Sequence, residues 1–266
     1  MRYLPSRVRG CLAATTLMVA VCTLANAGTQ SSEVEKKQIL ATARQKYYNL
    51  RRSGLIEFEA IITPNWQVVA DFRSNTAALE VLEGMKLSIS IDSESKLRLD
   101  HRSNLVPATE KSSDYIKKIF DDMDLSVSRF ISTWSLFMLT SPFSPVDSSY
   151  EITDFGDRYQ FSRREGEANV VTLTDKNFKI SEIKVTGAGV KASLKPALKE
   201  TSGGFILDGY ESKYETGSRH TRVEVRLEYQ LVSGQQLPRK ANVNAVYGGK
   251  PAQIEWLFSD YKVKVR

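Results

Sequence analysis

The sequence has 266 residues and a formal net charge of +6. A chain of this length fits one large domain with a single core. Its positive and negative side chains are interspersed without a basic tail or stripe, which argues against nucleic-acid binding, because that function requires Lys and Arg clustered on one face.

Residues 1–27 have the pattern of a secretory signal peptide. Three arginines precede an apolar stretch from about Cys11 to Leu24, and Ala25-Asn26-Ala27 supplies the small residues at which signal peptidase cleaves. The apolar stretch is too short for a permanent transmembrane helix, and no later stretch reaches that length. We therefore expect cleavage after Ala27 and a soluble periplasmic protein with no permanent membrane span.

Cleavage there removes three arginines and both cysteines. Residues 28–266 then carry a net charge of +3 and form no disulfide, although an oxidising compartment would allow one. The alternative is a lipidated N terminus at Cys22. Lipoprotein signals have a small residue before that cysteine, whereas Val21 stands here, so we prefer cleavage after Ala27.

An amphipathic helix is predicted directly after the signal. Ser32 and Glu35 form a capping-box pattern, and apolar residues recur at spacings of three and four from Leu40 to Leu50. Gly54 is the predicted C-cap. The pattern predicts a helix that lies on a sheet.

The hydrophobic period changes to two at Leu55, which predicts a strand. Phe58, Ala60 and Ile62 are expected to face a core, and Thr63-Pro64-Asn65 is expected to end the strand. Further along the chain, residues 77–84 predict a short helix. Alternation at 87–91 and 97–99, separated by a turn at 92–95, predicts a hairpin.

The longest helical pattern runs from about residue 113 to residue 140. Its second half, 130–139, has no charge and is apolar nearly all round, so it must be buried or touch something apolar. Two interpretations stay open for its large side chains: they line an apolar ligand cavity or its lid, or they fill the core beneath a sheet. The pattern alone favours core filling, and the site hypothesis rests on Phe130, Trp134, Phe137 and Met138.

The chain after Tyr150 is predicted to be almost entirely β. Candidate strands are 150–155, 157–164, 169–174, 178–186, 190–195, 204–214, 221–232, 240–247 and 252–264. Short turns between successive strands indicate antiparallel pairing. We therefore predict an α+β fold for residues 28–266. It is one domain with a curved antiparallel β-sheet, an unclosed half-barrel, whose concave face holds helices, including an insertion around 113–140.

No catalytic motif is present. His101 and His220 are far apart in sequence and are expected at the surface, and cleavage of the signal leaves no thiol nucleophile. Two groups of carboxylates could form glycosidase pairs, and we interpret them as ordinary solvated faces: Glu57 with Glu59, and Asp121 with Asp122 and Asp124. We expect no enzymatic activity, metal or cofactor.

Several features together suggest a family. An amphipathic helix follows the signal, a strand begins Leu55-Ile56-Glu57-Phe58-Glu59-Ala60, and helices interrupt the strand series. A late strand enters at Leu237-Pro238-Arg239-Lys240, and a terminal strand contains Phe258-Ser259-Asp260-Tyr261-Lys262-Val263. This layout resembles the periplasmic outer-membrane lipoprotein carriers (Lol-type) and their relatives. The family's early segment of alternating Trp, Pro and Arg is missing, so no binding residue is transferred from the family to this sequence. The helix predicted at 113–140 is also larger than the family's lid helices.

The resemblance implies an unclosed β-barrel that binds or carries an apolar ligand, such as an acyl chain, lipid or lipoprotein, in the cell envelope. Binding would be non-covalent, through removal of apolar surface from water, with segment 130–139 as inner wall or lid. Relatives of this architecture also serve as regulatory sensors. The alternative is therefore a protein-interaction or sensing module without a ligand, whose hollow is filled and whose partner is an envelope protein.

Overall fold

The computed structural model describes residues 29–30, 32–66, 82–94, 96–102, 110–143, 150–187, 189–217, 219–247 and 250–266. The predicted signal peptide, its cleavage site and both cysteines lie outside these residues. So does most of the short helix predicted at 77–84.

All thirteen strands of the described residues belong to one antiparallel sheet. The strands are β1 (Thr29–Gln30), β2 (Leu55–Pro64), β3 (Lys86–Ile91), β4 (Leu97–Arg102), β5 (Glu151–Asp154), β6 (Arg158–Glu165), β7 (Ala168–Asp175), β8 (Ile180–Gly187), β9 (Val190–Thr201), β10 (Gly204–Thr216), β11 (Arg219–Val232), β12 (Gln235–Tyr247) and β13 (Lys250–Val265). Their order is β1-β5-β6-β7-β8-β9-β10-β11-β12-β13-β2-β3-β4. The second strand in the chain, β2, therefore pairs with the C-terminal strand β13.

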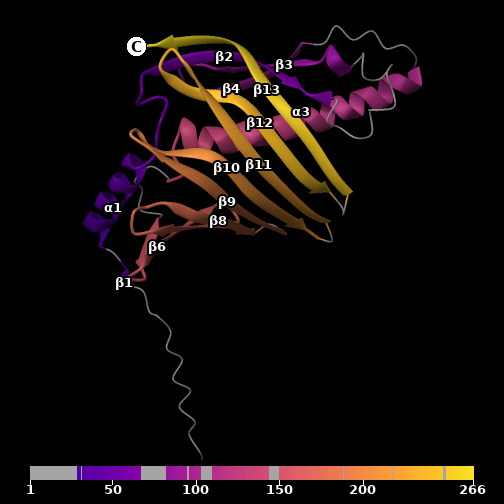
Figure 1. Ribbon diagram of the computed structural model, residues 1–266. Helices are drawn as coiled ribbons and strands as arrows, with labels where there is room; N and C mark the ends of the chain where they lie inside the picture. The colour runs from indigo at the N-terminus through magenta and orange to yellow at the C-terminus, as the bar shows by residue number, and fades with distance from the viewer. Residues whose placement is uncertain are drawn as a thin grey trace, which may run out of the picture.

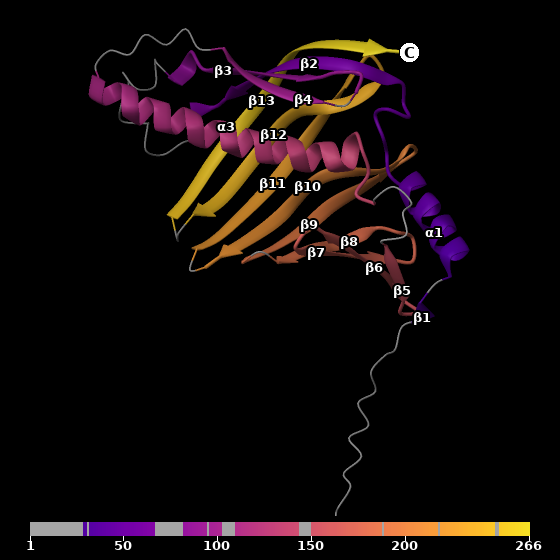
Figure 2. The same ribbon diagram turned by 180° about the vertical axis from the view of Figure 1, so that it is seen from behind.

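The sheet is curved and unclosed, and a long helix, α3 (Glu110–Met138), crosses its concave face (Figures 1 and 2). A shorter helix, α1 (Glu33–Gln45), lies beside β6 and β8 in both views. The predicted α+β half-barrel is confirmed. The nine strands predicted after Tyr150 correspond to β5 through β13, and the predicted hairpin is β3–β4.

Strand β9 extends six residues beyond its predicted end because a proline is tolerated there. The prediction stopped at residue 195, before Pro196, but Pro196 pairs with Tyr210 of β10. Strand β8 pairs with β9 only as far as Leu194. Beyond that point β9 has one neighbour among the described strands, and a proline costs no ladder hydrogen bond on the open side. Strand β2 likewise runs through Pro64, which pairs with Trp256.

Helix α1 begins as predicted and ends earlier. The Ser32 hydroxyl accepts a hydrogen bond from the Glu35 amide, and the Glu35 carboxylate accepts one from the Ser32 amide, which completes the capping box. The helix ends at Gln45 rather than near Gly54 because the chain turns into a parallel bridge between Tyr47 and Phe205 of β10. The helical spacing of apolar residues therefore overestimated the length of α1. Tyr47 fits that spacing, but it lies beyond the helix and is buried by tertiary contacts.

The C-terminal half of α3 forms the centre of the core. Trp134 packs edge-on against Phe58 of β2, with ring centroids 5.9 Å apart. The ring centroid of Phe130 lies 5.4 Å from that of Trp256 and 6.0 Å from that of Phe258, both on β13. These contacts fix the helix against the middle of the concave face, and they determine where space remains beside it.

Candidate functional site

A groove lies between α3 and strands β10 to β13. Its wider part has a volume of about 500 Å³ and runs between the N-terminal half of α3 and β12–β13. A narrow extension of about 30 Å³ continues toward β10 and β11. Ser126, Arg129 and Val243 line both parts, so the two are adjacent.

The groove exists because side chains on the concave face become smaller toward one end of β12 and β13. Near the middle of the sheet Ala241 pairs with Trp256, whose indole fills the space under α3. The next pair on the same face is Val243 with Ile254, and it is followed by Ala245 with Ala252. Since the separation of helix and sheet is set by the large Trp256, the alanine pair leaves a gap.

Helix α3 supplies the opposite wall of the wider part. Ile119, Met123 and Leu125 border it, and Leu125 is half exposed although it is a large apolar residue. The Trp256 indole donates a hydrogen bond to the Met123 sulfur at 3.2 Å, which fixes one side of the groove. Most of the lining is apolar: Trp66, Ile119, Met123, Leu125, Val243, Ala245, Ala252 and Ile254.

The four residues of the sequence hypothesis are all buried, with exposed fractions of 0 to 1%. Phe130 lines the narrow part of the groove. Trp134, Phe137 and Met138 belong to the core cluster beneath the sheet and border neither part. Their positions agree with the core-filling interpretation, and their role in ligand binding stays a prediction.

Sequence reasoning missed the residues that border the wider part of the groove, above all Arg129 and Ala252. The available signal was the size of the concave-facing residues in the last two strands. Ala241, Val243 and Ala245 alternate with polar residues and are smaller than the bulky side chains that usually cover a core. The alternation does not predict which helix packs on these residues, because that packing is a tertiary contact.

Three of the five carboxylates considered as catalytic pairs, Glu57, Glu59 and Asp121, lie in ordinary ion pairs. The Glu59 carboxylate lies 2.9 Å from the Lys262 ammonium, and the Glu57 carboxylate lies 3.6 Å from Lys264 on the neighbouring strand. Asp121 pairs with Lys117 one turn away on α3, at 2.9 Å. These contacts fit solvated faces.

His220 is exposed, as predicted. It lies on β11, and its Nδ1 is 3.8 Å from the Glu215 carboxylate on β10. Sequence spacing hid this neighbour because the two residues meet across a hairpin. Both side chains are more than half exposed. For His101 the structure describes the backbone position in β4 but not the side chain.

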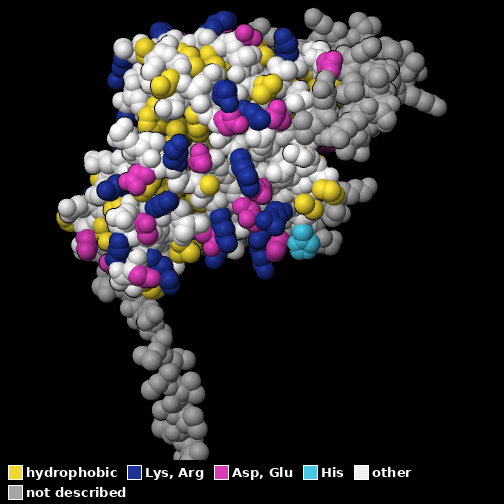
Figure 3. Space-filling model, in the orientation of Figure 1, with side chains coloured by type: hydrophobic (Ala, Val, Ile, Leu, Met, Phe, Trp, Pro, Cys, Tyr) yellow, Lys and Arg dark blue, Asp and Glu magenta, His cyan; other side chains and the backbone are white. Residues whose placement is uncertain are grey.

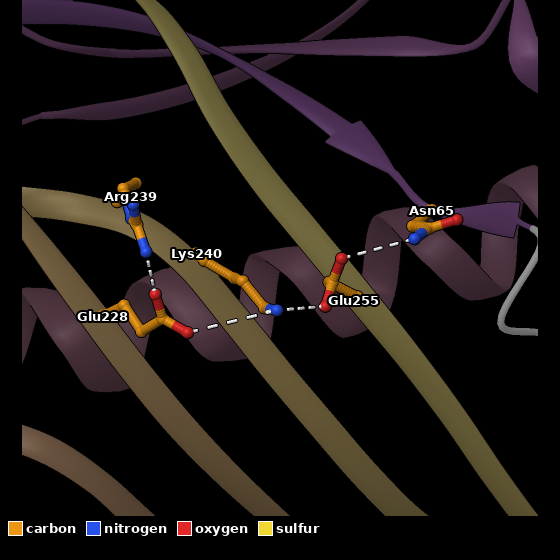
Figure 4. Close-up of polar contacts among 5 residues, drawn as sticks. All are labelled: Asn65, Glu228, Arg239, Lys240 and Glu255. Atoms are coloured by element: carbon orange, nitrogen blue, oxygen red, sulfur yellow. Dashed lines mark hydrogen bonds and ion pairs between the residues drawn. The ribbon is translucent and has the colours of Figure 1, made fainter.

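The convex face of the sheet carries Lys and Arg interspersed with Asp and Glu (Figure 3). Across β11, β12, β13 and the end of β2, five residues form a chain of polar contacts in the order Arg239, Glu228, Lys240, Glu255, Asn65 (Figure 4). The hydrogen bond from Lys240 holds the pKa of Glu255 below its ordinary value, and the same bond raises the pKa of Lys240. The polar face thus balances its charges internally, whereas the groove on the other face is apolar.

No protein-family model matches the chain, and a search of curated proteins finds no match either. Within the described ranges, no helix has the length and hydropathy needed to cross a membrane. In the same residues, no three His, Cys, Asp or Glu side chains are grouped so that they would hold a metal ion.

Proposed function

We propose that this protein is exported to the cell envelope and binds an apolar ligand, an acyl chain or lipid, non-covalently in the groove between α3 and β10–β13. The observation that carries the proposal is an apolar groove of about 500 Å³ beside a rigid core. This volume lies in the range of pockets that bind one small molecule, roughly 300–1,000 Å³. The pattern of residues 1–27 supports export.

Removal of apolar surface from water supplies the binding energy, at about 25 cal/mol for each Å². The groove suits this mechanism because its walls are already held apart. Trp256 and Phe130 set the spacing of helix and sheet. The groove beside Ala245 and Ala252 therefore does not need to open before an acyl chain enters. The likeness of the strand and helix order to the lipoprotein carriers supports the same class of ligand.

A protein-interaction or sensing module is the second candidate, and one observation favours it. Among the described strands, β4 ends the sheet and pairs only with β3. An unpaired edge of this kind accepts a strand from a partner. A protein with this function would bind a partner at residues 97–102, and its groove would stay without ligand.

A bulky substitution in the groove tests the proposal. Ala252 is exposed on the groove wall, so Ala252→Trp is expected to fold and to fill the space that a ligand would use. We expect it to weaken binding of a fluorescent fatty acid at least tenfold in a titration, because the apolar contact area is lost.

The matched control is Ala197→Trp, an exposed alanine on β9 that borders neither part of the groove. It should bind the probe as the unmodified protein does. Equal binding by both variants, with circular dichroism showing both folded, would rule out the groove as the site.

A further inference from the structure

The two parts of the groove differ in their lining: the wide part is mainly apolar, and the narrow extension has a larger share of hydroxyl-bearing residues. The wide part is bordered mainly by aliphatic and aromatic side chains. The narrow extension is bordered by apolar side chains and by five hydroxyl-bearing residues, Ser126, Thr133, Tyr210, Ser212 and Tyr214. The Ser126 and Thr133 hydroxyls donate to carbonyl oxygens of α3. Ser212 is a polar residue with an exposed fraction of only 2%, on the concave face of β10. A ligand that matches both regions has one apolar part and one polar end.

Arg129 of α3 stands where the two regions meet. It borders both the wide part and the extension, and its side chain is exposed to solvent. Among the described residues it takes part in no ion pair. By contrast, most cations on the convex face near β10–β13 have carboxylate partners, as Arg222 has Glu211 and Arg226 has Glu224.

Asp122 is the acid that borders the wide part together with Arg129. It lies seven residues earlier on α3, about 10 Å along the helix at 1.5 Å per residue. It is exposed to solvent and borders only the wide part. The guanidinium is therefore free to bind an anion where the two parts of the groove meet.

We infer that the ligand is a single-chain amphiphile with a carboxylate head, a long-chain fatty acid, whose head binds Arg129 while its chain lies between α3 and β12–β13. The inference rests on the proposed function and adds the ligand class. One guanidinium balances one negative charge, and its planar pair of N–H donors fits the two oxygens of a carboxylate. A single apolar space of about 500 Å³ accommodates one chain more readily than the two chains of a phospholipid.

The experiment compares a charged ligand with a neutral one of the same length. Palmitate and hexadecan-1-ol are titrated separately into the protein without its signal peptide and into Arg129→Gln. We expect the variant to bind palmitate about tenfold more weakly, in keeping with one charge-assisted hydrogen bond at an accessible site, and to bind the alcohol unchanged. The control is Lys118→Gln, which removes an exposed cation of α3 that borders neither part of the groove. It should leave both affinities unchanged.

The outcomes distinguish a failure of ligand binding from a failure of the role assigned to Arg129. If the unmodified protein binds neither compound, the proposed function itself fails. If it binds both, and Arg129→Gln weakens both equally or neither, the groove binds apolar chains but the role of Arg129 is overturned. Tighter binding of hexadecyl phosphate than of palmitate would overturn the fatty-acid assignment.

Discussion

The contacts of Glu255 predict how the stability of the protein depends on pH. Its carboxylate accepts hydrogen bonds from Lys240 and, at 3.3 Å, from the Asn65 amide. The Lys240 bond is the main cause of its lowered pKa. Because the folded state prefers the charged form, Glu255 adds stability above its ordinary pKa of about 4.3 and loses that contribution as the pH falls through the lower, folded value.

We therefore expect Glu255→Gln to lower the free energy of unfolding at pH 7 by about 0.5–1 kcal/mol, the size of a well-placed surface pair. The difference from the unmodified protein should be constant between about pH 7 and pH 5 and should shrink toward pH 3. Urea unfolding at several pH values measures it. Glu200→Gln is the control, since Glu200 is exposed and takes part in no ion pair among the described residues. A difference that grows in acid would contradict the assignment.

At the scale of elements, the C-terminal end of α3 is held by the segment that follows α1. The Asn49 side-chain amide donates hydrogen bonds of 2.9 Å to the carbonyl oxygens of Leu139 and Thr140. The Leu50 amide donates to the Met138 carbonyl at 2.8 Å. Carbonyl groups at a helix end have no partner within the helix, so these donors complete α3 and join it to the rest of the fold.

Substitution of Asn49 should loosen this end of α3. Asn49→Ala removes these two hydrogen bonds and the one that the Asn49 Oδ1 accepts from the Arg52 amide. It is expected to cost about 1–2 kcal/mol in the free energy of unfolding. Asn49→Asp should cost more, because it also places a negative charge at the negative end of the helix dipole. Chemical denaturation measures both, with Asn244→Asp, an exposed asparagine on β12, as control. An Asn49→Asp protein as stable as the unmodified one would show that the cap is unimportant.

Elements with a regular hydrophobic period were predictable from the sequence, and elements fixed by tertiary contacts were not. The long period of α3 and the alternation of β10 to β13 each reflect one buried face, which is local information. The end of α1 is set instead by the bridge between Tyr47 and Phe205, residues far apart in the chain. Nothing near Gln45 in the sequence signals that pairing.

The candidate site illustrates the same limit more strongly. The buried aromatic residues of α3 were visible as an apolar run, and the structure places them in the core. The groove depends on small residues of β12 and β13 lying opposite the N-terminal half of α3. Its position therefore follows from how helix and sheet cross, which no single segment encodes.

At the scale of the whole molecule, one curved sheet separates two surfaces with different chemistry. The convex surface carries charged residues that pair with one another (Figures 3 and 4). The concave surface is filled by α3 over its middle and leaves the apolar groove toward one end. Under the proposed function, the concave surface would keep an apolar ligand away from water while the outer face stays solvated.

The most direct test is native mass spectrometry of the protein without residues 1–27, purified from an exporting host without detergent and followed by organic extraction and lipid analysis. We predict a discrete adduct whose extract contains an acyl compound. If Arg129 binds a carboxylate head, this compound is a fatty acid. A clean mass of the protein alone, with no uptake of added lipid, would contradict ligand binding and direct attention to a protein partner at β4.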